Sequence, residues 1–258
     1  MSVADINSYR AENSPVPAVL RATKILEVMA RHNGPMSSSD IARETMLAKS
    51  SVSNLLATLQ TAGMARQVSR GWVLGFRVLE LGQSVLSSTD LISEFRRKVG
   101  MLDILREETA LIGVLDGLEV LYLARHNGNQ PVRLAIDIGQ RLPAVVTSLG
   151  KAMLASLPED EMLDRLSTIR EMPRLTNHSY RTMSELRGDL DDIRVRGYSI
   201  DDQQNTSGIT CFGVAITGLN QPTAVSSTMI SHRATPQLRD RLILDLRSLA
   251  RQLSRVAA

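Results

Sequence analysis

Small polar side chains gather on one face of the helix predicted over residues 49–62, opposite a stripe of leucines and one valine. Short side chains let a helix lie close in the major groove of DNA. Asn54 could bond an adenine edge at two positions, and basic residues before and after the helix could meet phosphates. The predicted DNA-binding residues are Lys49, Ser50, Ser51, Ser53, Asn54, Thr58, Arg66 and Arg70.

A second candidate site begins in the segment GQRLPAVVTSLGKAM, residues 139–153. Thr147 or Ser148 suits the N-cap of a helix that continues through Gly150 and Lys151. The free N–H groups and the positive dipole end of such a helix attract a carboxylate, and Gly150 would allow close approach. The alternative is an ordinary capped surface helix. A phosphate loop is excluded, because Val145 stands where its first glycine is needed and Ala152 where it needs Ser or Thr.

The sequence shows no motif for metal binding or nucleophilic catalysis. Its four histidines are scattered without metal-ligand spacing, and neither G-x-S-x-G nor H-E-x-x-H occurs. The single cysteine, Cys211, allows no intrachain disulfide and has no evident base beside it. The sequence therefore predicts no catalytic residue, no metal site and no cofactor.

The elements that position the first site are three helices and a hairpin. Apolar spacing predicts helices from Pro17 to about residue 32, from Ser37 or Ser38 to Thr45, and over 49–62, then strands over 64–68 and 72–74. The Ser37-x-x-Asp40 run resembles a capping box. Two helices joined by three residues are typical of a helix-turn-helix, with the hairpin as its wing. A packing or dimerisation bundle with a solvated helix is the alternative.

A different pattern begins after a predicted helix over residues 77–87. Strands are predicted near 111–116, 118–125, 132–136, 209–217 and 222–231, and helices over 90–108, 148–155, 159–166, 184–196 and 236–256. Such a mixture predicts an α+β domain with a largely antiparallel sheet. The predicted domains are a tail over 1–16, a winged helix-turn-helix over 17–76, a linker helix over 77–89, and an effector-binding and oligomerisation domain over 90–258.

The charge is unevenly distributed along the 258 residues. The net charge is only +3, which by itself does not indicate a nucleic-acid binder. Residues 19–80, however, carry eight Lys and Arg against four acidic residues, a net +4, so the remainder sums to −1. No apolar run is long enough to span a bilayer and no secretion signal begins the chain, so we expect a cytoplasmic protein without membrane contact.

Several runs resemble the IclR family of bacterial transcriptional regulators. They are VLRATKILEVMARHNGPMSSSDIARETMLAKSSVSNLLATLQTAGMARQ, RGWVLGFRVLELG, REETALIGVLDGLEVLYLAR, GQRLPAVVTSLGKAMLA and RVRGYSIDDQQNTSGITCFGVAI, which together cover about residues 17–255. The resemblance implies an N-terminal winged helix-turn-helix, a linker helix and a C-terminal mixed α/β effector-binding domain. It also implies a homodimer, or a dimer of dimers, on a pseudo-palindromic operator, with a small organic acid as effector.

The family pattern also indicates which residues would line the effector pocket. Asp201, Ile209 and Cys211 occupy the corresponding positions, and alternation along a strand puts Ile209 and Cys211 on one face. Ser227 and Met229 share a face of the returning strand and would form the far wall. For Cys211, a small buried packing residue is the alternative. The predicted effector-binding residues are Ser148, Leu149, Gly150, Asp201, Ile209, Cys211 and Ser227.

Four positions depart from the family pattern. Met46 stands where the turn between the helices usually has glycine, which would strain the backbone if φ is positive there. Asn54 stands where the family often has Arg, so the operator should differ. Ala144 and Val145 replace a larger residue and a histidine. We expect these two to make the cavity roomier and less polar, which favours a larger effector such as an aromatic carboxylate.

The sequence thus predicts a ligand-responsive, DNA-binding transcriptional regulator rather than an enzyme. One alternative is an enzyme that its N-terminal unit merely dimerises, but Asp201 and Cys211 have no paired base to act with. Another is an architectural DNA-binding protein without an effector, which a ligand-sized cavity in the second domain would argue against.

Overall fold

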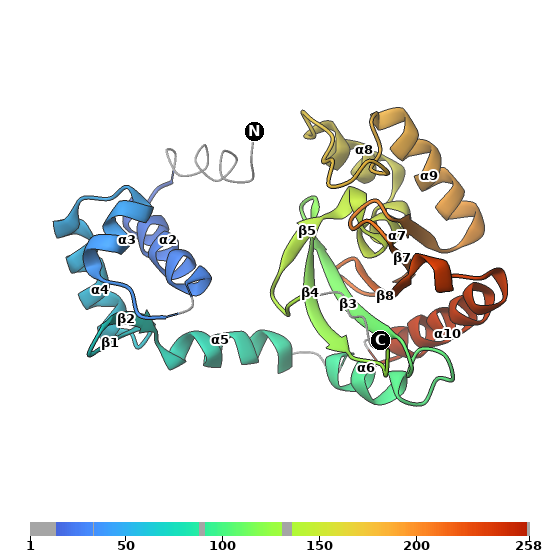
Figure 1. Ribbon diagram of the computed structural model, residues 1–258. Coiled ribbons are helices and arrows are strands. Elements are labelled where there is room, and N and C mark those ends of the chain that lie inside the picture. Colours follow the sequence, from blue (N-terminus) through green and yellow to red (C-terminus); the bar gives the residue numbers. More distant parts are fainter. Residues whose placement is uncertain (1–13, 33, 88–90, 131–135, 257–258) are drawn as a thin grey trace. The chain divides into compact units, whose positions relative to one another are not determined.

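The computed structural model describes residues 14–32, 34–87, 91–130 and 136–256 and separates the chain into two compact units, residues 1–88 and 89–258. Each unit has its own core, and each is described by itself (Figure 1). Among the helices that the structure describes, none is both long and apolar enough to cross a membrane.

The first unit contains the three predicted helices, the hairpin and a further helix. The helices are α2 (Pro17–Arg31), α3 (Ser38–Thr45), α4 (Lys49–Thr61) and α5 (Phe76–Ser87), and the hairpin consists of β1 (Ala65–Val68) and β2 (Gly71–Leu74). Ile25, Ile41, Val52 and Leu56 are completely buried where α2, α3 and α4 meet. The strands pair antiparallel, with Ser69 and Arg70 between them. This arrangement is a winged helix-turn-helix.

Local sequence signals fix the ends of these helices. The Ser37 hydroxyl accepts a hydrogen bond from the Asp40 N–H at 3.1 Å, as a capping residue does. The reciprocal bond of a capping box differs, because the Asp40 carboxylate accepts from the Ser37 hydroxyl, at 2.6 Å. Met46 ends α3 in the left-handed conformation, with φ 56° and ψ 31°. The turn does require a positive φ, and methionine adopts it here where glycine would do so at lower cost.

The second unit is built around a six-stranded antiparallel sheet with the order β5-β4-β3-β8-β7-β6. The strands are β3 (Thr109–Asp116), β4 (Glu119–His126), β5 (Arg141–Pro143), β6 (Ser199–Asp202), β7 (Ile209–Ile216) and β8 (Thr223–Ile230). Four of them were predicted within about two residues, while the short strands β5 and β6 were not. The strand predicted over 132–136 falls almost entirely outside the described residues.

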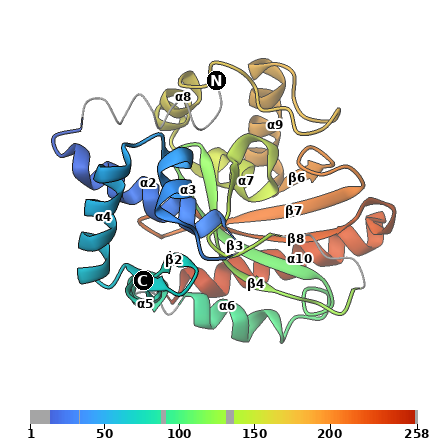
Figure 2. The same ribbon diagram turned by 60° about the vertical axis from the view of Figure 1, so that its left-hand side comes forward.

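Helices cover both faces of this sheet (Figures 1 and 2). One face carries α7 (Ser148–Ser156), with α8 (Glu159–Ser167) and α9 (Met183–Arg196) beyond it, and the other carries α6 (Leu91–Val99) and α10 (Pro236–Ser254). A 3-10 turn, η1 (Ala144–Val146), leads into α7, and a second, η2 (Ser231–Arg233), precedes α10. The helix predicted over 90–108 is shorter, since α6 ends at Val99 and turns follow it. The fold is the predicted α+β class.

Candidate functional site

The predicted DNA-reading residues gather on α4 and the hairpin. Of the eight, only Ser51 is half-buried, and the other seven are exposed. Ser50 and Asn54 are four residues apart, so they lie on the same side of α4, opposite the buried residues Val52 and Leu56. Ala57 and Thr61 continue that side towards the end of the helix, and with Thr58 and Ala62 they line an open hollow. Apart from Lys49 and Gln60, the exposed residues of α4 therefore have short side chains.

The beginning of α4 has no side-chain cap and no acidic residue in its first turn. The first N–H groups of a helix have no partner within it, and they carry the positive end of the helix dipole. Lys49 adds a positive charge at the same end. This end of α4 can receive a phosphate group. Arg70 lies in the turn between β1 and β2, where its exposed side chain can do the same.

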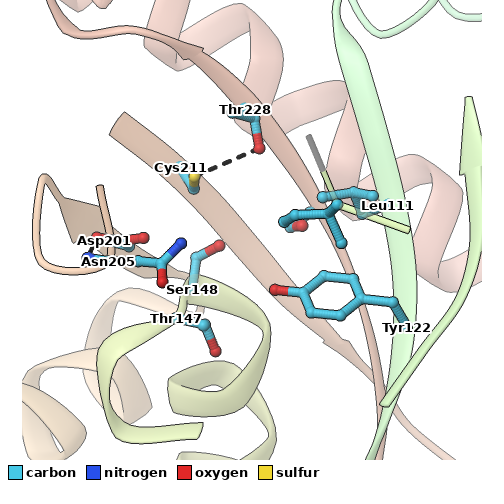
Figure 3. Close-up of a pocket in the computed structure, with 10 residues that line it drawn as sticks. Leu111, Tyr122, Thr147, Ser148, Asp201, Asn205, Cys211 and Thr228 are labelled. Carbon is cyan, nitrogen blue, oxygen red and sulfur yellow. Dashed lines mark hydrogen bonds between the residues drawn. The ribbon is translucent and has the colours of Figure 1, made fainter. Parts of the chain in front are cut away.

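Ten residues line a small pocket in the second unit, between α7, the loop after β6 and one face of the sheet (Figure 3). They are Leu111, Tyr122, Ile136, Thr147, Ser148, Asp201, Asn205, Cys211, Ser226 and Thr228. The centre of a water-sized sphere can occupy only about 10 Å³ of it, roughly the room of one water molecule. Half of the ten lining residues carry a hydroxyl, and no lysine or arginine is among them.

The start of α7 forms one wall of the pocket. Thr147 is the N-cap, and its hydroxyl accepts from the Gly150 N–H at 3.1 Å. Among the described residues, the N–H groups of Ser148 and Leu149 have no hydrogen-bond acceptor. Ser199 Oγ donates to Ser148 O and ties this turn to β6. The two free N–H groups give the pocket a partial positive charge in a wall without cationic side chains.

Asp201 on β6 and Cys211 on β7 form a second wall of the pocket. Burial raises the pKa of the Asp201 carboxyl to about 6. Its Oδ1 accepts from the N–H groups of Gln204 and Asn205, at 2.7 and 3.2 Å, so this oxygen holds the loop in place. Burial, reinforced by the charge of Asp201, raises the pKa of the Cys211 thiol well above its ordinary value. The thiol therefore stays protonated, 3.3 Å from Thr228 Oγ1, and has no thiolate with which to act as a nucleophile.

Tyr122 on β4 contributes a donor that the sequence analysis did not identify. Only 3% of the residue is exposed, and its hydroxyl points into the pocket (Figure 3). Burial raises the pKa of this phenol, so it remains a neutral hydrogen-bond donor. An aromatic residue with a polar tip in an otherwise aliphatic strand is the signal that could have identified it.

Four of the seven predicted effector-binding residues do not line the pocket. Leu149 is part of the core cluster beneath α7. Gly150 serves packing, because a Cβ there would lie 2.3 Å from the Ala144 Cα. Ile209 lies at the first position of β7, two residues before Cys211. Ser148, Asp201 and Cys211 do line the pocket, as predicted.

Ser227 is on the wrong face of the sheet for the role assigned to it. The register pairs Cys211 with Thr228 and Leu111 with Ser226, so these four side chains share the pocket face. Ser227 pairs with Phe212 and Ala110 and points to the opposite face, which α6 and α10 cover. Its hydroxyl is buried and has no hydrogen-bond partner among the residues that the structure describes. The far wall is formed by Ser226 and Thr228 instead.

The expected effect of Ala144 and Val145 on the cavity is also wrong. Both are buried in the core cluster of the second unit, and neither lines the pocket. Ala144 is small because its backbone lies against Gly150. The pocket is therefore neither enlarged nor made apolar by these two residues.

A buried lysine lies behind the pocket. Lys151 follows Gly150 in α7, and none of its surface is exposed. Its Nζ donates to Asp189 Oδ2 at 2.7 Å, to Gln204 Oε1 at 2.6 Å, and to the carbonyl of Ile200. Burial lowers the pKa of Lys151, and Asp189 opposes that shift. The lysine thus joins α7 and α9 to the loop that carries Asn205. The sequence signal for this buried lysine was its place among the apolar residues of the helix over 148–156.

Comparisons with known proteins agree with both units. The family profile described as IclR helix-turn-helix domain matches residues 18–69, and that described as bacterial transcriptional regulator IclR C-terminal matches residues 83–255. The transcriptional repressor IclR of Escherichia coli (strain K12) is 30% identical over 205 residues, which are 78% of this chain and 74% of the repressor.

Two solved structures are similar over nearly the whole chain. The Thermotoga maritima IclR structure has a TM-score of 0.71 and 25% identity, and covers 92% of this chain and 98% of its own. An IclR homologue from Microbacterium hydrocarbonoxydans, complexed with 4-hydroxybenzoate, has a TM-score of 0.77 at 22% identity, with coverages of 92% and 98%. The named relatives are regulators and repressors, in agreement with a regulator rather than an enzyme. The chain belongs to the IclR family of bacterial transcriptional regulators.

Proposed function

We propose that this regulator binds its operator through α4 and the hairpin, and that a small carboxylic acid in the pocket of the second unit modulates that binding. The observation that carries the proposal is the exposed face of α4. From Ser50 to Thr61 its side chains are uncharged and, apart from Gln60, short, and the helix begins at an uncapped, positively charged end. A face of this kind fits the major groove, whereas a solvated helix usually carries long charged side chains there.

The hydroxyls of α4 suggest different roles for its residues. Ser53 Oγ donates to Lys49 O and Thr58 Oγ1 donates to Asn54 O, both at 3.0 Å, so these two hydroxyls can only accept from DNA. Asn54 and Ser50 form no side-chain hydrogen bond among the described residues. We assign base reading to Asn54 and Ser50, and phosphate contacts to Lys49, Arg66 and Arg70.

The pocket supports an acid held by neutral donors. The free N–H groups of Ser148 and Leu149 and the Tyr122 hydroxyl would bind the carboxylate, while Asp201 would accept a bond from a hydroxyl of the same ligand. Because the pocket has room for only about one water molecule, binding an organic acid must move lining side chains apart. That displacement is a means by which the effector can favour one conformation over another.

The lining favours a small hydroxy or oxo acid. Only Leu111 and Ile136 present aliphatic side chains to the pocket, whereas Thr147, Ser148, Ser226 and Thr228 present hydroxyls. An aromatic acid is the competing effector candidate, because one homologue was solved in complex with 4-hydroxybenzoate. Both kinds of acid would place the carboxylate at the start of α7. An aromatic acid would need more apolar surface from the pocket walls than a small hydroxy or oxo acid.

The signal from pocket to operator requires an assembly of more than one chain. We propose a homodimer, or a dimer of dimers, in which effector binding changes the spacing of two winged units through the helix at residues 77–87. Two such units read two half-sites, so the operator would be pseudo-palindromic. The effector must bind the two states unequally, since equal affinity shifts nothing.

The proposal is tested by footprinting on the DNA upstream of the protein's own gene, at two salt concentrations, with and without lactate, pyruvate and 4-hydroxybenzoate. We expect a protected site that weakens with salt, and a footprint or affinity that changes with one of the acids. A site that every bound acid leaves unchanged would contradict effector control. Absence of any sequence-specific site would contradict operator binding.

A further inference from the structure

Phe76, the first residue of α5, is exposed over 67% of its surface. The Arg66 guanidinium of β1 lies over its ring, with Cζ 4.8 Å from the ring centroid. An arginine within about 6 Å of an aromatic face is attracted by the ring's electron density. The exposed ring thus has a specific neighbour, and that neighbour is a residue to which we assign a phosphate contact.

The backbone around Phe76 is held against the end of α4 and the start of the hairpin. The Gly75 N–H donates to Met64 O at 2.8 Å, and the Arg77 N–H donates to Gly63 O at 3.3 Å. A Cβ on Gly75 would lie only 1.9 Å from Gly63 O, so no larger residue fits this junction. The backbone that carries Phe76 is therefore fixed relative to β1, which places the ring beside Arg66.

Stacking leaves the hydrogen-bonding edge of the guanidinium available. Among the described residues, no carboxylate pairs with Arg66, whereas Arg77 nearby is bonded to Glu80 at 2.7 Å. The N–H groups of a stacked guanidinium point outward in the plane of the group, which is the geometry that a phosphate accepts. A mobile arginine would first have to be ordered, and ordering a long side chain costs entropy.

We propose that Phe76 is a positioning residue for DNA binding, which holds the Arg66 guanidinium ready for a backbone phosphate beside the wing. The inference rests on the proposed function and deepens it. The first residue of α5 thus affects affinity through Arg66, so a displacement of this helix would alter a phosphate contact.

The test is a double-mutant cycle in the full chain, with Arg66→Ala, Phe76→Ala and both together, measured as operator affinity across a salt series. Arg66→Ala should reduce the slope of log K against log salt by about 1 per protomer. Phe76→Ala should weaken binding about two- to fivefold when Arg66 is present, and should have no effect when it is absent. Phe76→Tyr, which keeps a ring, should restore binding.

Leu79→Ala provides a matched control, because Leu79 is exposed on the same helix, one turn further on. It should leave the salt slope unchanged. Light scattering on the same samples reports whether Phe76 instead supports self-association. The inference is overturned if Phe76→Ala weakens binding equally with and without Arg66, or acts by changing the molecular mass. If the wild-type chain fails to bind DNA specifically, the proposed function fails instead.

Discussion

Lys151 and Asp189 form an ion pair of 2.7 Å inside the second unit, where the lysine side chain is completely buried. The pair joins α7, whose first turn forms one pocket wall, to α9. Gln204, three residues after Asp201 in the other wall, accepts a further bond from the same ammonium group. A buried ammonium group is tolerated only when its protons are satisfied, so the two walls and α9 are held by one group.

Replacing Lys151 by Met should lower the free energy of unfolding by about 3 kcal/mol, because it leaves buried acceptors without their donor. Urea denaturation measures this. Arg141→Met is the control, since Arg141 pairs with Asp116 at 2.6 Å on the surface and should cost less than about 1 kcal/mol. Similar losses for the two variants would show that the buried network contributes no more than a surface pair.

Met46→Gly should raise the free energy of unfolding by about 1 kcal/mol, since it relieves a left-handed conformation. Little packing is lost, because Met46 is 85% exposed. The matched variant Glu44→Gly lies inside α3, where glycine should instead cost about 1 kcal/mol. Thermal and urea unfolding check both signs, and a destabilised Met46→Gly would indicate that the side chain makes a contact we have not identified.

Asn54→Ala should relax base choice at one position of each half-site, by about 1–3 kcal/mol of discrimination. The salt slope should stay the same, because no phosphate contact is removed. Selection from randomised DNA gives the preference, and Ser167→Ala, an exposed serine at the end of α8, is the control. Unchanged preference at every position would mean that another face reads the operator.

Ser226→Ala and Ser227→Ala form a matched pair on opposite faces of β8. Ser226→Ala should weaken effector binding, since its hydroxyl lines the pocket. Ser227→Ala should leave effector affinity unchanged and raise the free energy of unfolding by up to about 1 kcal/mol, because it removes a buried hydroxyl that has no partner in the described part of the chain. Calorimetric titration and urea unfolding separate the two effects. Loss of effector binding in Ser227→Ala alone would contradict the register.

Effector binding should depend on the ionisation of Asp201, whose pKa burial raises to about 6. An anionic effector disfavours a second negative charge, so the bound form holds the Asp201 proton more tightly. Affinity should therefore rise as the pH falls from 8 towards 6, by at most about tenfold per unit, and level off below 6. Asp201→Asn should flatten this profile in calorimetric titrations. A wild-type profile that is already flat would exclude coupling to Asp201.

The sequence alone determined the class of protein and most of its elements. Apolar spacing is local, so helices such as α4 and α10 and strands such as β7 and β8 were predicted within about two residues. Met46 was singled out because it stands where the resembling family usually has glycine, and the structure gives it the positive φ that such a turn requires. The eight residues predicted to bind DNA lie close in the sequence for a similar local reason, as they belong to one helix and the hairpin that follows it.

The tertiary structure alone decided which side chains meet in the pocket. Alternation along β8 separates Ser226 from Ser227, but only pairing with β3 and β7 fixes which of them faces α7, and a shift of one residue reverses the answer. Tyr122, Asn205 and Cys211 come from distant parts of the chain and meet through that same register. The stacking of Arg66 on Phe76 likewise depends on where α5 begins against the end of α4. Local patterns specify elements, whereas contacts between distant elements depend on packing that the whole chain determines.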